Sequence, residues 1–243
     1  MRRLAWWFDG LLVAAFAGLT ALLAAGHLLD VDLAVSDWAF AHQPAVAHYP
    51  ALALNYLGQG GPFVVLCTLL ALWLGHRWRD VRPIILVAAT YLLAGVVVAP
   101  LKEFSGRDAP RSALPNRAEL FNDLARAGYD WSYPSGHMVN AFVWFFTLLT
   151  LLTWIFGERV RRFGTALRVA PPIIVFGTTV YLNYHWLTDS IAGLLIGLVL
   201  VRLLERVRWR TLPLPAWVQW RGRSAGAGGA EPAEAADQHR VVG

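Results

Sequence analysis

Apolar residues recur along this chain in long, nearly uninterrupted runs. A membrane-spanning helix needs about 20 mainly apolar residues, because backbone amides in hydrocarbon must find their partners within the helix. Six stretches meet or approach this length, and we expect a span in each: Leu11 to Leu29, Pro62 to Gly75, Pro83 to Leu101, Val139 to Phe156, Val169 to Tyr184 and Leu187 to Leu204. The pattern predicts an all-α, polytopic membrane protein built as a six-helix bundle.

Three of these runs raise questions of their own. The second and fifth are short, so either they begin earlier, the second for instance through Ala51 to Leu57, or they tilt little and lean on their neighbours. Met1 to Gly26 has the basic start and apolar centre of a signal peptide. We expect it to remain as the first span, because its apolar run is long for such a peptide and its loss would spoil the even span count.

Composition supports the membrane interpretation. The 243 residues are 57% hydrophobic and 15% charged, with a mean hydropathy of +0.47, whereas a soluble domain has roughly 25% charged residues. A net charge of +5 would suit a nucleic-acid partner in a soluble protein. Here the arginines stand beside apolar runs, so we expect contacts with membrane lipids and none with nucleic acid. The single cysteine, Cys67, offers neither a disulfide framework nor a zinc site.

Arginine clusters predict the orientation. They are Arg2 and Arg3; Arg77, Arg79 and Arg82; Arg159, Arg161, Arg162 and Arg168; and Arg202, Arg206, Arg208 and Arg210. All four fall on one side of a six-span chain, which the positive-inside rule makes cytoplasmic. We therefore expect a multi-pass protein of the cell membrane with both termini in the cytoplasm. The segments Asp30 to Gly61 and Lys102 to Gly136, and the turn near His185, then face outward.

The domain plan is simple. Residues 1–220 form one membrane domain, to which the outer-face loop 102–136 contributes part of a site. Residues 221–243 are rich in Gly, Ala, Glu and Arg without apolar periodicity, so we expect a disordered cytoplasmic tail. Nothing in the sequence indicates an oligomeric state.

His185 and Asp189 form the first of three polar groups in the outward segments. They are four residues apart at the start of the last span, so on a helix they share a face. A carboxylate there can hold the imidazole and leave its other nitrogen free to attack an electrophile. The simpler alternative is a histidine at a helix start and an acid at the positive end of the helix dipole.

Pro-Ser-Gly-His precedes the fourth span and is the second group. Ser135 and the amides of Gly136 and His137 lie at a helix N-terminus, which suits an anion. His137 stands where it could protonate a leaving oxygen. An ordinary turn and N-cap would explain the Ser and Gly but gives no purpose to a histidine at the membrane edge.

Three cations form the remaining group. Lys102 ends an apolar run, and Arg107 and Arg111 follow in a segment broken by Gly106 and Pro110. Such side chains could bind phosphate oxygens, and arginine can do so with two bonds. A snorkelling lysine and interfacial arginines are the alternative.

In content and order, the three groups resemble the type 2 phosphatidic acid phosphatase (PAP2) family, membrane lipid phosphatases related to vanadium haloperoxidases. That family carries Lys, then Arg-Pro seven residues later, then Pro-Ser-Gly-His, then Ser-Arg before His-x-x-x-Asp, on a six-helix bundle with its site at the outer face. The resemblance covers about Lys102 to Gly193.

The resemblance implies roles for these residues. His185 would be the nucleophile that forms a phosphohistidine, with Asp189 as its orienting partner and His137 as the general acid. Ser135 and Gly136 would bind phosphate oxygens, and Lys102 would neutralise their charge. No metal or other cofactor is implied, because fixed cations and amides stabilise the transition state.

Two positions depart from the family pattern. Ala109 stands seven residues after Lys102, where the family has Arg, and Thr178-Thr179 stands where it has Ser-Arg. Arg107 or Arg111, two residues either side of Ala109, could replace the first arginine. Thr179 could supply only a neutral hydrogen bond at the second.

We expect a phosphatase acting on a lipid phosphomonoester or diphosphate. The candidate lipids are phosphatidic acid, phosphatidylglycerol phosphate and polyprenyl phosphates or diphosphates, glycosylated or not. Related phosphotransferases keep the paired His and the Asp but vary the arginines, so transfer of a phospho-head group between lipids stays open. A non-catalytic lipid-phosphate binding protein is a further alternative, although such a binder needs cations more than it needs a nucleophile.

Overall fold

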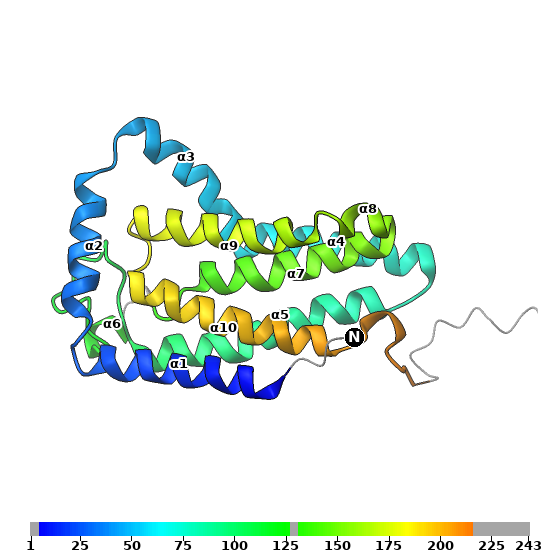
Figure 1. Cartoon of the computed structure of the whole chain (residues 1–243), viewed down its shortest axis with the longest axis horizontal. Helices are drawn as coiled ribbons and strands as arrows, with labels where there is room; N and C mark the ends of the chain where they lie inside the picture. Colours follow the sequence, from blue (N-terminus) through cyan, green and yellow to red (C-terminus); the bar gives the residue numbers. More distant parts are fainter. Residues whose placement is uncertain (1–4, 127–130, 216–243) are drawn as a thin grey trace, which may run out of the picture.

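Six long helices lie side by side in an alternating up-and-down bundle (Figure 1). The computed structural model describes residues 5–126 and 131–215. The bundle helices are α1 (Trp6–Ala24), α4 (Gly60–Trp78), α5 (Arg82–Ser105), α7 (Gly136–Phe156), α9 (Gly164–Tyr181) and α10 (Leu187–Arg206). They match the six predicted runs and confirm the all-α bundle. The predicted tail, residues 221–243, lies outside the described residues.

Five of the described helices are long and apolar enough to cross a membrane: α1, α4, α5, α7 and the helical segment Leu187–Thr211 that contains α10. The sixth bundle helix, α9, has 18 residues and contains Arg168, Pro171 and Pro172. It packs along α7 and runs the length of the bundle (Figure 1). A short, less apolar helix can hold this position because a neighbour supports it.

Several boundaries differ from the prediction. α1 ends at Ala24 rather than Leu29, because a turn with Gly26 at φ +79° separates it from α2 (Leu29–Ala41). The segment through Ala51 to Leu57 does not extend the second span. It belongs to a separate helix, α3 (Ala45–Asn55), followed by the 3₁₀ turn η1 (Tyr56–Gly58).

The short elements gather at the two ends of the bundle. α2, α3 and α6 (Asp123–Arg126) lie at one end, with α2 crossing the bundle direction (Figure 1). α8 (Glu158–Arg161) and η2 (Trp209–Thr211) lie at the other end, where α1 begins and α10 finishes. The expected outward and inward segments are therefore sorted to opposite ends.

α7 is the central helix, with contacts to α4, α5, α9 and α10. Its buried apolar side chains pack with Leu86 of α5 and Leu200 of α10 in the main core. Thr90 and Thr147 hydrogen-bond across α5 and α7 at 2.9 Å, so their hydroxyls are paired within this apolar layer. The packing fixes the starts of α7 and α10 relative to one another.

Candidate active site

His137, His185 and Asp189 lie at the end of the bundle where α5 finishes and α7 and α10 begin, an end that can be followed in Figure 1. His137 is in the first turn of α7, and His185 lies in the short connection between α9 and α10. Asp189 follows in the first turn of α10. Residues widely separated in sequence thus form one site.

His185 lies between a carboxylate and a second imidazole. Its Nδ1 is 3.7 Å from Oδ2 of Asp189, and its Nε2 is 3.3 Å from Nδ1 of His137. The carboxylate is just beyond hydrogen-bond distance, as catalytic pairs often are before substrate binds. With a proton on Nδ1, facing Asp189, the Nε2 atom presents a lone pair on the side of His137.

Burial sets the charge of His185. The side chain is almost fully enclosed, and this burial lowers the pKa of the imidazole below its ordinary value, with positive Lys102 acting in the same direction. Asp189 opposes the shift without reversing it. The imidazole is therefore neutral at physiological pH, as a nucleophile must be.

Asp189 is held from two other sides. Its Oδ2 accepts a hydrogen bond from the backbone N–H of Trp186 at 3.0 Å, and its Oδ1 accepts one from Nη1 of Arg107 at 2.5 Å. The carboxylate also lies at the positive end of the α10 dipole. These contacts fix the oxygen that faces His185.

Arg107 is buried and lies outside the wall of the pocket beside His185. Its guanidinium is completely buried and makes four hydrogen bonds, to the Ala118 carbonyl, Thr188, Asp189 and Asp32. Four of the five N–H donors of the Arg107 guanidinium are therefore engaged within the protein, away from the predicted phosphate contact. Arg107 instead links the loop after α5 to α2 and to the start of α10.

Asp32 of α2 is a site component that the sequence analysis did not identify. It accepts hydrogen bonds from the backbone N–H of Thr188 at 3.0 Å and from the Thr188 hydroxyl at 2.5 Å, in addition to Arg107. The only sequence signal was an acid within a mostly apolar segment, a placement that is costly without a partner. Its partners come from distant segments that spacing does not reveal.

Ser135 caps α7 and does not line the pocket. Its Oγ accepts from the backbone N–H of Met138 at 3.4 Å, and the side chain is fully buried. A Cβ on Gly193 of α10 would approach the Ser135 carbonyl oxygen to 2.5 Å, so only glycine permits this close packing. The turn is thus locked to α10, while the neighbouring Gly136 does line the pocket.

The pocket has a volume of about 650 Å³. Its wall includes Lys102, Ala109, Gly136, His137, Tyr184 and His185, together with the segment Gly58–Pro62. Among the described residues of the wall, Lys102 is the only Lys or Arg. Its Nζ donates to the Trp131 carbonyl at 2.5 Å, and Trp131 also lines the pocket. Cationic charge in the wall is therefore concentrated at one point.

Of the remaining predicted residues, Arg111 lies beside the pocket and Thr179 lies away from it. Arg111 is exposed, with its guanidinium carbon 4.7 Å from the centroid of the Tyr184 ring, and Tyr184 in turn stacks on His137. Arg111 thus lies beside the pocket wall. Thr179 is buried on α9, where its hydroxyl is 2.9 Å from Oδ1 of Asn55 in α3, so it joins two helices away from the pocket.

Among residues 5–126 and 131–215, no three His, Cys, Asp or Glu side chains form a group able to hold a metal ion. The charged and titratable side chains described at this site are two imidazoles, a buried carboxylate and a lysine.

Comparison with known proteins places this arrangement in a family. The PAP2 superfamily model matches residues 83–212, which is more than half of the chain. Among solved structures, the fold is similar to a Bacillus subtilis protein described as the first transmembrane PAP2 type phosphatidylglycerolphosphate phosphatase, with a TM-score of 0.66 and 19% identity over 82% of this chain and 94% of that one. No curated protein matches. The chain belongs to the PAP2 superfamily.

Proposed function

We propose that the protein is a membrane phosphatase that hydrolyses a phosphomonoester or diphosphate of a phospholipid or polyprenyl lipid through a phosphohistidine. The observation that carries this proposal is the placement of His185, with Asp189 at Nδ1 and His137 at Nε2, in the wall of a pocket. A nucleophile with an orienting carboxylate and an adjacent proton donor is the arrangement that covalent phosphoryl transfer needs.

In the first step, the lone pair on Nε2 of His185 attacks phosphorus. The P–O bond to the lipid breaks as the P–N bond forms, and His137 gives a proton to the leaving oxygen. Asp189 stabilises the positive charge that develops on the His185 ring. The lipid alcohol, or lipid monophosphate when the substrate is a diphosphate, leaves the site.

In the second step, water attacks the phosphohistidine. His137 takes a proton from this water, the P–N bond breaks, and the electron pair returns to Nε2 of His185. Inorganic phosphate is released and both histidines regain their starting states. Lys102 and the backbone amides at the start of α7 stabilise the charge on the equatorial oxygens in both steps.

Arg107 and Arg111 take different roles in this scheme. Arg107 is a positioning residue, because it touches Asp189 and not the pocket. Arg111 is the candidate to supply the phosphate contact that Ala109 cannot make, since it lies over the ring of Tyr184, which lines the pocket. Ala109 itself lines the pocket, so an arginine at this position would point toward the same space.

A phosphotransferase is the second candidate. The observation that favours it is the pocket wall, where Ala109 replaces a family arginine and Lys102 is the only described cation. A phosphodiester carries less charge than a phosphomonoester and needs fewer cations around it. An alcohol of a second lipid would then replace water in the second step.

We further propose that the site lies at the outer face of the cell membrane. The support is the sorting of the four arginine clusters by the positive-inside rule, with the segments around His137 and His185 at the other end of the bundle. Substrate would then be drawn from the outer leaflet.

Phosphate release by the purified protein in EDTA tests the reaction class. The panel would contain phosphatidic acid, phosphatidylglycerol phosphate and polyprenyl phosphate and diphosphate, each with wild type and His185→Ala. We expect metal-independent release with wild type alone. An acid-labile, base-stable phosphoenzyme trapped with ³²P-labelled substrate would support the phosphohistidine, whereas turnover without such a species, by both proteins, would contradict it.

A further inference from the structure

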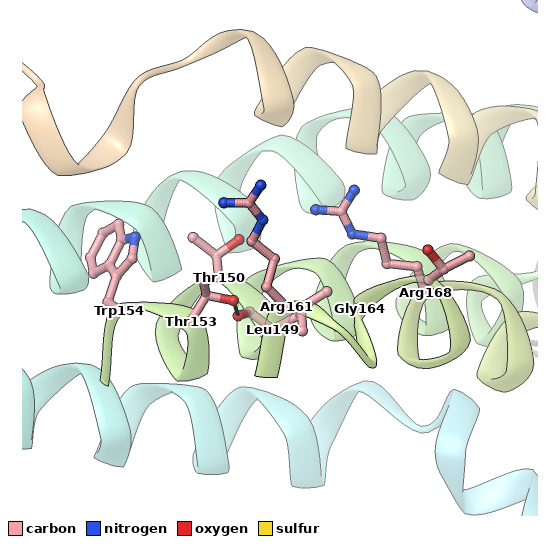
Figure 2. Close-up of a pocket in the computed structure, with 8 residues that line it drawn as sticks. Leu149, Thr150, Thr153, Trp154, Arg161, Gly164 and Arg168 are labelled. Carbon is pink, nitrogen blue, oxygen red and sulfur yellow. Dashed lines mark hydrogen bonds between the residues drawn. The ribbon is translucent and has the colours of Figure 1, made fainter. Parts of the chain in front are cut away.

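A second pocket lies near the C-terminal end of α7, at the opposite end of this helix from His137. Figure 2 shows the residues that line it. It has a volume of about 350 Å³ and is formed by the last turns of α7 and by the α8–α9 segment. Its polar lining consists of Thr150, Thr153, Trp154, Arg161, Thr165 and Arg168. Thr153 follows His137 by sixteen positions along α7, which corresponds to about 24 Å of helix. This pocket is distinct from the candidate active site.

We propose that this pocket binds the phosphate group of an anionic phospholipid of the cytoplasmic leaflet. The leaflet follows from the orientation proposed above, whereas the phosphate chemistry follows from the pocket itself. Basic pockets between membrane helices on the cytoplasmic side suit anionic headgroups. The following contacts support this assignment.

Two guanidinium groups extend over the pocket from different helices. Figure 2 shows Arg161 and Arg168 reaching to the same side of their ribbons. Arg161 donates through Nη1 to Glu158 at 2.6 Å, and Arg168 donates through Nη1 to Glu205 at 2.8 Å. These are the only hydrogen bonds of the two guanidiniums within the described chain, so the Nε and Nη2 donors of both remain for a further acceptor.

Neutral donors complete the set. The indole N–H of Trp154 and the Thr165 hydroxyl make no hydrogen bond with the described residues, and both side chains line the pocket. The hydroxyls of Thr150 and Thr153 instead donate to the carbonyls four residues earlier, at 2.8 and 2.7 Å. Two charged and two neutral donors therefore face one cavity, which suits the several oxygens of a phosphate group.

The surroundings favour a lipid over a soluble ester. The segment 157–168 carries four arginines and one glutamate, so its charge attracts anionic headgroups. Phe156, Phe163 and Val169, close to the pocket in sequence, are exposed at 54%, 55% and 48%. Such apolar side chains beside a cationic pocket give acyl chains a surface to lie on while the phosphate is bound.

Native mass spectrometry of the full chain in detergent tests the proposal. The probes are phosphatidylglycerol and phosphatidylcholine with the same acyl chains. We expect one tightly bound phosphatidylglycerol, at least fivefold weaker in Arg161→Gln/Arg168→Gln and within twofold of wild type in Arg159→Gln, an arginine of the same segment that does not line the pocket. Any lipid bound in the active site is common to all variants and cancels in this comparison.

A further variant, a turnover assay and competition with a soluble phosphate ester distinguish the possible explanations of lipid binding. Thr165→Val removes a donor without changing charge and should weaken binding about twofold. Unchanged lipid-phosphate turnover by the double variant would show that it is folded and that this pocket is separate from the active site. Displacement of the lipid by glycerol 1-phosphate would retain the phosphate site but assign it to a soluble ester. Equal binding of the two lipids, or an equal loss in Arg159→Gln, would overturn the proposal.

Discussion

Nη1 of Arg107 lies 2.5 Å from Oδ1 of Asp189, and both side chains are completely shielded from solvent. The other carboxylate oxygen of Asp189 faces His185. The loop after α5 therefore controls the position of the candidate nucleophile through one carboxylate. Arg107 therefore contacts Asp189 directly but does not line the pocket.

Replacing Arg107 should damage both stability and rate. Arg107→Ala leaves Asp32 and Asp189 buried without their cation, a loss that costs about 3 to 5 kcal/mol for a buried pair. Because Arg107 acts through Asp189, kcat should fall by at least tenfold with little change in KM. Thermal unfolding and steady-state kinetics would measure both effects. Glu119→Ala, on the exposed surface of the same loop, is the control and should be silent.

His185 and Asp189 should differ in the severity of their loss. His185→Ala removes the nucleophile and should abolish turnover of the best lipid. Asp189→Asn keeps the imidazole but loses its orientation and charge partner. The rate should therefore fall by roughly 10³-fold to 10⁴-fold, and a measurable residual rate should remain. Near wild-type turnover by His185→Ala would rule out the phosphohistidine.

Arg111 is expected to provide the missing phosphate clamp. Arg111→Ala should lower kcat by roughly a hundredfold, because a charge-assisted contact contributes mainly in the transition state. Arg111→Lys should restore activity only in part, since an ammonium lacks the planar fork. Ala109→Arg, placed in the pocket wall, should rescue Arg111→Ala. Full turnover by Arg111→Ala in detergent would exclude this role.

The pH dependence of kcat/KM should reflect the protonation of the His185 imidazole. Its pKa lies below the usual value of about 6.5, so the neutral imidazole persists as the pH falls. The acidic limb of kcat/KM should therefore lie below pH 6.5, with activity lost as the pH drops through the lowered pKa. Asp189 raises this pKa, so Asp189→Asn should move the limb to still lower pH. A limb above 6.5 in the wild type would contradict the assignment.

Cysteine labelling checks the orientation. In a Cys67→Ala background, a membrane-impermeant thiol reagent applied to intact cells should label Asp123→Cys and leave Ala225→Cys unlabelled. Permeabilised cells provide the control, since both positions should then react. Labelling at position 225 alone in intact cells would reverse the proposed topology.

The sequence predicted the bundle because hydrocarbon imposes one strong requirement, helical backbone pairing over a fixed length. The six runs and the grouping of His137, His185 and Asp189 follow from this requirement and from local spacing. α2 and α3 were not anticipated, because helices at the end of the bundle need not meet a length requirement. Their boundaries depend on turns such as that at Gly26.

The site was less accessible to sequence reasoning. Proximity to Ala109 made Arg107 a candidate phosphate ligand, yet its guanidinium turns toward Asp32, which lies 75 residues earlier. Ser135 was assigned to phosphate from its motif, while in the structure its hydroxyl caps α7. In both cases residue type and spacing were correct guides to location. Partners on distant helices decided the direction of the Arg107 side chain, whereas the backbone N–H of Met138 in the same turn decided that of Ser135.

The Asp32–Arg107–Asp189 linkage also makes the surroundings of Arg107 depend on the last helix of the bundle. Asp32 and Arg107 emerge early, but Asp189 follows Arg107 by 82 residues. A nascent chain that stops before the last span lacks Thr188 and Asp189, so two of the four hydrogen bonds of the buried Arg107 guanidinium cannot form. Completion of the chain thus supplies the missing partners of Arg107 together with the carboxylate that we propose orients His185.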